Sequence, residues 1–333
     1  MASQTSKILK YLLFVGLAIV LLWLAFKETD PTELWESLRK ADYRYVLLFM
    51  LMGYAAYISR GMRWLLLLET MNYKPSKWAS IHSVAIGYFA NMAVPRAGEV
   101  ARCTSLNKLE VIPVSKLFGT VIVERTIDFL MLASFITGAL LTSYSSFTAL
   151  YSKATGTNKT SETSFFSSPI FYIILLGGLV LILLFVFRHR LTQLPLYAKI
   201  RSFLAGVWEG FKAVFKMKKK ALFLLHTFFI WTMYYLMVYV VIYAIPETQH
   251  LTPANMLFVM VAAGMGMVIP VPGGVGAYHY LVVLSLGLLG VSDTVGLSFA
   301  TLVHSGQSIM AIITGVIAML YIYYRKRNSL IAS

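Results

Sequence analysis

Three charged side chains lie within seven residues of one another in the stretch NMAVPRAGEVAR, at positions 91–102, where an apolar run ends. Arg96 and Arg102 carry guanidinium groups that suit bidentate contact with a phosphate. Glu99 is able to hold one arginine in place when no ligand is bound, or to accept an amine or a proton from a substrate. These side chains predict a site for an anionic group. The alternative is a cytoplasmic loop whose charges are solvated.

The backbone of the same stretch is interrupted by Pro95 and Gly98. A break at membrane depth releases N–H and C=O groups that hydrocarbon cannot satisfy, so it must be buried in protein or line a wet cavity. The N-terminal end of a helix that follows such a break attracts an anion. A second break of the same kind occurs in GMVIPVPGGVGAYH, at positions 266–279, and its backbone residues are Pro270, Pro272, Gly273, Gly274 and Gly276.

A second group of charges, Glu124, Arg125 and Asp128, lies in an apolar run that is long enough to span a membrane. Glu124 and Asp128 share one helix face, and Arg125 is able to reach Asp128 at a spacing of three residues. Ionisable groups inside a membrane are costly unless they are paired or hydrated, so they mark a path for an ion or a substrate. The alternative is a cluster at headgroup level, because the charges lie only about 15 Å into the helix by the rise per residue.

Three polar side chains, His279, His304 and Gln307, stand out in the apolar second half of the chain. A lone histidine on an apolar helix is often only a hydrogen-bonded structural residue. His304 is the better candidate for proton coupling near neutral pH, because its run is long enough to span.

No metal centre and no cofactor are expected. Cys103 is the single cysteine and cannot form an internal disulfide. His82 and His226 show no metal-binding spacing to other histidines or carboxylates. There is no glycine-rich phosphate loop and no Ser-His-Asp set.

The composition predicts one all-α polytopic membrane domain over residues 1–333. The chain is 58% hydrophobic and only 13% charged, and its mean hydropathy is +0.72. The formal net charge of +15 could suggest nucleic acid. Basic residues concentrate in the loop 188–220 and in 325–327, however, and such juxtamembrane clusters fit the positive-inside bias and anionic lipid headgroups. A nucleic-acid partner is therefore not expected.

Apolar runs predict about six full spans and two shorter segments that end at the breaks. The full spans are predicted at 8–26, 44–60, 117–143, 170–187, 221–245 and 297–324. The shorter runs are 79–94 and 254–270. The N-terminal run has no small-residue cleavage site after it and is expected to stay as an uncleaved helix. Arg60 and Arg63 are assigned to a basic loop after the second span.

Charge bias and the count of crossings together predict the topology. If both termini and the loop 188–220 are cytoplasmic, the first break lies in a hairpin that enters from the cytoplasm and returns. Residues 254–290 then enter from the outer side, either as a re-entrant hairpin or as two short complete helices. Two hairpins that face each other indicate an inverted repeat with halves 44–143 and 221–324.

The chain is similar to the flippase-like transmembrane region of lysylphosphatidylglycerol synthases. The resemblance is carried by NMAVPRAGEVAR, VERTIDF and PVPGGVGAY, in this order. The resemblance covers residues 8–324 and implies a stand-alone integral membrane member, because the soluble transferase domain is absent; synthase activity is not implied. The positions on which the family pattern places functional weight are Asn91, Pro95, Arg96, Gly98, Glu99, Arg102, Glu124, Arg125, Asp128, Pro270, Pro272, Gly273, Gly274 and Gly276.

The chain departs from the family pattern in its second half. Many members carry a Glu where this chain has Tyr278 or His279, and many carry an Arg near the position of His304. These departures leave the identity of the substrate open.

The resemblance implies a translocase that moves a polar-headed lipid, anionic or aminoacylated, across the cytoplasmic membrane, with membrane phospholipid as its partner. One alternative is an intramembrane enzyme that modifies a lipid headgroup or a polyprenyl phosphate, with Glu99 or Asp128 as general base. Another is a non-transporting protein that docks a cytoplasmic partner on the loop 188–220. The lipid, the coupling ion and the oligomeric state are left open.

Overall fold

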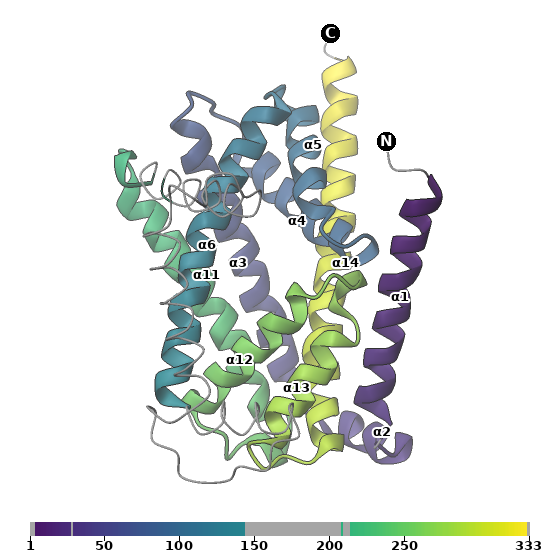
Figure 1. Ribbon diagram of the computed structural model, residues 1–333. Helices are drawn as coiled ribbons and strands as arrows, with labels where there is room; N and C mark the ends of the chain where they lie inside the picture. Colours follow the sequence, from purple (N-terminus) through teal and green to yellow (C-terminus); the bar gives the residue numbers. More distant parts are fainter. Residues whose placement is uncertain (1–3, 28, 144–207, 209–213, 332–333) are drawn as a thin grey trace, which may run out of the picture.

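The structure is a computed structural model that describes residues 4–27, 29–143, 208 and 214–331 (Figure 1). All regular secondary structure in these ranges is helical, which confirms the predicted all-α class. The helices of ten residues or more are α1 (Gln4–Phe26), α2 (Pro31–Lys40), α3 (Tyr43–Glu69), α4 (Lys77–Ala93), α5 (Gly98–Glu110), α6 (Val114–Thr142), α11 (Lys220–Val240), α12 (Pro253–Val268), α13 (Ala277–Gly287) and α14 (Asp293–Ile331). Three 3-10 turns accompany them, η2 (Val241–Ala244), η3 (Pro246–Thr248) and η4 (Pro272–Gly274).

Three of the described helical segments, Tyr43–Glu69, Lys220–Ala244 and Asp293–Arg325, are long and apolar enough to cross a membrane. They correspond to predicted spans, and α1 and α6 run alongside them through the bundle (Figure 1). The predicted span 170–187 lies outside the described residues, as does most of the loop 188–220. The chain is therefore a helical membrane bundle, as predicted.

Both proline–glycine breaks form helical hairpins that enter the bundle from opposite sides. The pair α4–α5 enters from the side where α14 ends, and α12–α13 enters from the side of α2 (Figure 1). Their tips meet at mid-height. A Cβ atom placed on Gly273 would lie only 3.8 Å from the Cα atom of Met92. Each hairpin is flanked by longer helices in the same order, α3 and α6 in one half and α11 and α14 in the other, which is the arrangement that an inverted-topology repeat produces.

The two breaks differ in length and in the residues that turn the chain. The first covers residues 94–97, and its left-handed residue is Arg96, with φ +63°. The second covers residues 269–276, which carry positive φ at Gly273, Gly274 and Gly276. The interpretation of Gly98 as a break residue was wrong, because α5 begins there. Gly98 and Gly273 therefore do not occupy equivalent places, although aligning Pro95 with Pro270 pairs them in sequence.

Gly98 is required by close packing rather than by its backbone angles. A Cβ atom at this position would collide with the carbonyl oxygen of Gly87 in α4. The reverse contact is also tight, since a Cβ atom on Gly87 would lie 2.9 Å from the carbonyl oxygen of Gly98. Two facing glycines thus let α4 and α5 pack backbone to backbone, as small residues do between membrane helices.

Buried apolar side chains hold the hairpins in place. A large cluster joins α3, α11, α12, α13 and α14, with Phe49, Phe299 and Met256 fully buried within it. A second cluster joins α3 to α5 and α6 around Trp64 and Leu106. The hairpins are thus anchored to helices that run the full height of the bundle, and only their tips are free of these clusters.

Candidate functional site

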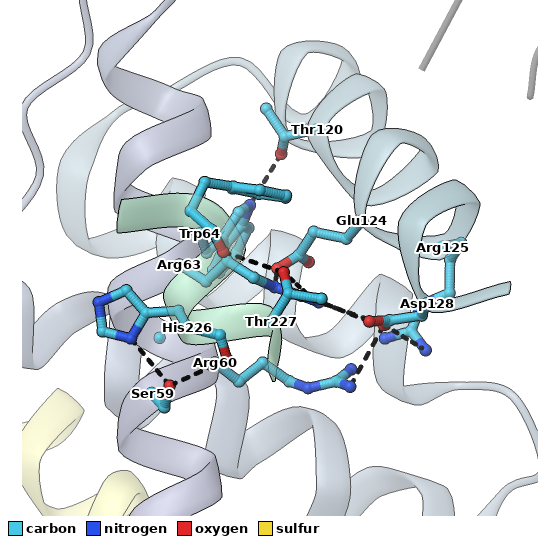
Figure 2. Close-up of polar contacts among 12 residues, drawn as sticks. Ser59, Arg60, Arg63, Trp64, Thr120, Glu124, Arg125, Asp128, His226 and Thr227 are labelled. Carbon is cyan, nitrogen blue, oxygen red and sulfur yellow. Dashed lines mark hydrogen bonds and ion pairs between the residues drawn. The ribbon is translucent and has the colours of Figure 1, made fainter. Parts of the chain in front are cut away.

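Asp128 is the meeting point of arginines from two helices. The Arg63 side chain of α3 donates from Nη1 to Oδ1 of Asp128 at 2.8 Å, and from Nη2 to Oδ2 at 3.2 Å. Arg60, one turn earlier in α3, donates from Nη2 to Oδ2 at 3.2 Å. Figure 2 shows both arginines pointing from α3 toward the carboxylate on α6. Asp128 therefore links α6 to α3 through ion pairs.

Glu124, one turn before Asp128, joins the first hairpin to the same cluster. Its carboxylate accepts a hydrogen bond from Nη2 of Arg102 on α5. Nε of Arg63 lies 3.5 Å from its other oxygen. The guanidinium of Arg102 also lies 4.3 Å from the centre of the Trp64 ring, at a distance that gives a cation–π contact. The predicted shared face of Glu124 and Asp128 is confirmed, because both carboxylates contact Arg63.

Glu99 and Arg125 form the exposed side of the cluster. The Nε atom of Arg125 lies 2.9 Å from Oε1 of Glu99, and its Nη1 atom lies 3.6 Å from Asp128. Oε2 of Glu99 lies 3.2 Å from Nε of Arg102. The Arg125 side chain is 46% exposed, whereas the side chains of Arg63 and Glu124 are completely buried. Arg125 is thus the arginine that an incoming ligand is able to reach with the smallest rearrangement.

The cluster carries one positive charge in excess. Four arginines (60, 63, 102 and 125) face three carboxylates (99, 124 and 128), which leaves 4 − 3 = +1. A buried ion pair is costly to desolvate and is weak as a source of stability, so such a cluster points to binding rather than to folding. The unbalanced charge favours an anion.

Two adjoining cavities lie beside the cluster. The larger, of about 420 Å³, is lined by Arg60, Arg102, Arg125 and Asp128, and it extends toward α11 and α12. The second, of about 410 Å³, lies between the hairpin tips and is lined by residues of both breaks, among them Pro95, Pro270 and Gly273. Residues shared by the two walls are Tyr57, Tyr88, Asn91, Glu99, Met267 and Gln307.

The other predicted site residues line one of these cavities or form a hydrogen bond with the backbone. Arg96 is exposed and lines the cavity between the tips, apart from the ion-pair cluster. Asn91 caps α5, because its Oδ1 atom accepts from the N–H of Gly98 at 2.7 Å. Gln307 reaches both cavities. The predicted residues of the first half thus converge, with Arg96 as the exception.

The two histidines lie together at the second break. The Nε2–H group of His304 on α14 donates to the carbonyl of Gly273 at 2.9 Å. The rings of His279 and His304 are 4.8 Å apart between centroids. His304 therefore fixes the second hairpin tip to a full-length helix, and it also lines the cavity between the tips.

Arg60 and Arg63 are the site residues that the sequence interpretation missed. Their assignment to a loop after residue 60 was wrong, because α3 continues to Glu69 and buries both side chains. The signal was present in the sequence: four leucines follow at 65–68, and a spacing of three residues places both arginines on one helix face.

Metal-binding geometry is lacking among the described residues, where no three His, Cys, Asp or Glu side chains come together. Cys103 is buried and carries a free thiol. His226 pairs with Ser59 at 2.8 Å between Nδ1 and Oγ, away from both cavities.

The sequence of the chain is similar to that of known membrane proteins. The profile of the lysylphosphatidylglycerol synthase TM region matches residues 8–315. A UPF0104 membrane protein of Pyrococcus horikoshii is 32% identical over 139 residues, which are 40% of this chain and 40% of that protein. The chain thus aligns with less than half of that relative. No solved structure matches the chain.

Proposed function

The chain belongs to the family of the lysylphosphatidylglycerol synthase TM region, and from this premise we propose that it moves an anionic phospholipid between the leaflets of the cytoplasmic membrane. The family is named after a membrane region. The similarity to a UPF0104 membrane protein supports a membrane location. Both termini are proposed to face the cytoplasm, in agreement with the basic residues near them.

The single observation that carries the proposal is an arginine-rich cluster with an excess positive charge on the wall of a cavity, beside two hairpins that enter from opposite sides. An arginine suits a phosphodiester because its planar fork donates two parallel hydrogen bonds. Arg125 is the half-exposed member, so a lipid phosphate is able to replace Glu99 or Asp128 as its partner.

Movement of one hairpin against the other would carry the headgroup past the tips. The cluster joins α5 of the first hairpin to α6 through ion pairs of Glu99 and Arg102 with residues 124 and 125. A phosphate that competes for Arg125 weakens this connection and biases the hairpin toward a second position. Alternating access by rocking of the two halves around a central site is the usual mechanism of transporters with inverted repeats.

The carboxylates support translocation more than headgroup chemistry. Glu99 and Asp128, the two candidates for a general base, are each held by two or more arginines, which stabilise the charged form of the carboxylate. Proton abstraction from a substrate would first require these pairs to open. We therefore propose a transporter without enzymatic activity.

The test is transfer of fluorescent phosphatidylglycerol in reconstituted vesicles, measured as protection from a quencher that cannot cross the bilayer. The wild-type protein is expected to speed up transfer over empty vesicles. Arg125→Gln is expected to lower the rate about 10-fold or more, because a hydrogen bond to a charged group contributes about 1.5–3 kcal/mol. The matched control is Arg44→Gln, whose side chain is 93% exposed and lies at the start of α3.

Two results would count against the proposal in different ways. Wild-type vesicles that transfer lipid no faster than empty ones would refute translocation. A normal rate in Arg125→Gln would refute the role of the cluster while leaving translocation intact.

A further inference from the structure

Three neutral hydrogen-bond donors of residues that line the larger cavity have no partner among the described residues. They are the hydroxyls of Tyr57 and Tyr278 and the Nε1–H group of Trp231. All three residues are buried. Buried tyrosine and tryptophan normally find a partner for their polar atom, and an unpaired buried donor costs about 1–3 kcal/mol. Three such donors around one cavity indicate an occupant that offers several acceptors.

The donors belong to a wall that begins at the arginine cluster. Tyr57 stacks on Tyr88, with 4.0 Å between ring centroids and an angle of 6° between the planes. The hydroxyls of Tyr88 and Tyr234 are 2.9 Å apart, and the Tyr234 ring packs edge-on against Trp231 at 6.0 Å. The Arg60 guanidinium lies 5.9 Å from the Tyr88 ring centre and 6.0 Å from that of Tyr234. A ligand whose phosphate is held by the cluster therefore places its headgroup along these aromatic residues.

The charges of the cluster favour a neutral headgroup over a cationic one. Each of the three carboxylates contacts at least two arginines, so Glu99 and Asp128 each keep an arginine partner when a phosphate takes their place at Arg125. The phosphate of the ligand cancels the excess charge of +1, and the donors of Tyr57 and Trp231 offer no negative charge that would attract an ammonium group. A polyol headgroup accepts hydrogen bonds from these tyrosine and tryptophan donors, and it adds no charge.

We infer that the larger cavity selects a phosphodiester lipid whose headgroup is a neutral polyol, such as glycerol or inositol. The inference rests on the proposed translocation and narrows its substrate class. The phosphate contacts the arginines that line the cavity, and the hydroxyls accept from Tyr57, Trp231 and Tyr278.

The test is binding of four short-chain lipids to the purified full-length protein in detergent, measured as a shift of thermal unfolding. The probes are dihexanoyl phosphatidylglycerol, phosphatidylinositol, phosphatidylmethanol and phosphatidylethanolamine. Phosphatidylmethanol has the same single negative charge as the first two and lacks hydroxyls. The polyol lipids are expected to bind about five-fold more tightly than phosphatidylmethanol for each hydrogen bond gained. Phosphatidylethanolamine is expected to bind least tightly.

Variants that lack one of these donors test the assignment of the hydroxyl contacts. Tyr57→Phe and Trp231→Phe should each reduce the preference for the polyol lipids about five-fold and leave the affinity for phosphatidylmethanol unchanged. The control is Tyr239→Phe, which removes a hydroxyl that pairs with Tyr243 outside the cavity. The relative affinities for glycerol and inositol headgroups then decide which polyol fits.

Each remaining outcome overturns the inference. Equal binding of the three anionic probes, unaffected by the variants, would mean that the donors hold only water. Tightest binding of phosphatidylethanolamine would refute the argument from charge. Transfer in vesicles without polyol preference would refute the inference and leave the proposed translocation standing, whereas selective binding without any transfer would refute translocation alone.

Discussion

Replacing Glu124 by Gln removes the charge that Arg102 contacts while nearly preserving the shape of the side chain. Both side chains are buried, and the Arg102 guanidinium also lies 3.2 Å from Glu99 and makes a cation–π contact with Trp64. Removing one partner of a buried ion pair costs about 3–5 kcal/mol, because the other charge stays buried and loses its hydrogen-bonded partner. We therefore expect Glu124→Gln and Arg102→Gln each to lower the free energy of unfolding by about this amount.

The double variant Arg102→Gln/Glu124→Gln should cost less than the sum of the two single changes, because it removes both charges of this pair together. The expected coupling energy is about 1–3 kcal/mol. At roughly 2 °C per kcal/mol for a chain of this size, each single variant should lower the unfolding midpoint by about 6–10 °C.

The chain carries its own probe for this assay. Cys103 is the single cysteine and is completely buried next to Arg102 on α5. A thiol-reactive dye added to the protein in detergent therefore reports when α5 separates from the bundle. The pair Glu36 and Lys40, whose side chains are 61% and 75% exposed, supplies a control cycle with an expected coupling below about 0.5 kcal/mol. Additive effects at Arg102 and Glu124, within about 0.5 kcal/mol, would refute the buried ion pair.

Two further predictions concern the hairpins. Gly98→Ala should destabilise the protein by about 1–3 kcal/mol, because its Cβ atom collides with Gly87. The control Gly119→Ala should be neutral or stabilising, because a Cβ atom there meets nothing within 4 Å. The same thiol assay measures both variants, and equal unfolding midpoints would contradict the packing. His304→Phe should lower the unfolding midpoint by the equivalent of about 1–3 kcal/mol, because the carbonyl of Gly273 loses its donor. His304→Gln should recover part of this loss. A His304→Phe protein as stable as wild type would show that the contact contributes nothing.

The opposed hairpins could be predicted because two physical constraints act on the whole chain. Hydrocarbon does not tolerate an unpaired backbone, so the breaks at Pro95 and Pro270 had to lie in protected turns. Basic residues mark one side of the membrane, so the parity of crossings decided from which side each hairpin enters. Figure 1 shows this arrangement, with the two tips meeting inside the bundle.

The charged site was predicted only in part, because pairing between helices depends on tertiary packing. Glu124, Arg125 and Asp128 stood out as charges within an apolar run, but their partners Arg60 and Arg63 did not. A span scored by apolarity ends at the first arginine, whereas α3 continues because carboxylates on α6 neutralise these charges. The role of Gly98 was missed for a related reason, since its neighbour Gly87 belongs to another helix.

The aromatic wall was also beyond the reach of the sequence. Tyr57, Tyr88 and Trp231 are unremarkable in a chain with 20 tyrosines and six tryptophans. Only the packing of α3, α4 and α11 brings them to one cavity and leaves two of their polar atoms unpaired.

The central claim is that lipid crosses the membrane because the two hairpins move against each other. Met92→Cys and Gly273→Cys, in a Cys103→Ala background, place two thiols across the meeting point of the tips, where a Cβ atom on Gly273 lies 3.8 Å from the Cα atom of Met92. A short reversible thiol crosslinker then joins the hairpins in vesicles, and each single-cysteine variant treated in the same way is the control. The account predicts that crosslinking stops the transfer of phosphatidylglycerol and that a reductant restores it. Undiminished transfer with the tips joined would contradict it.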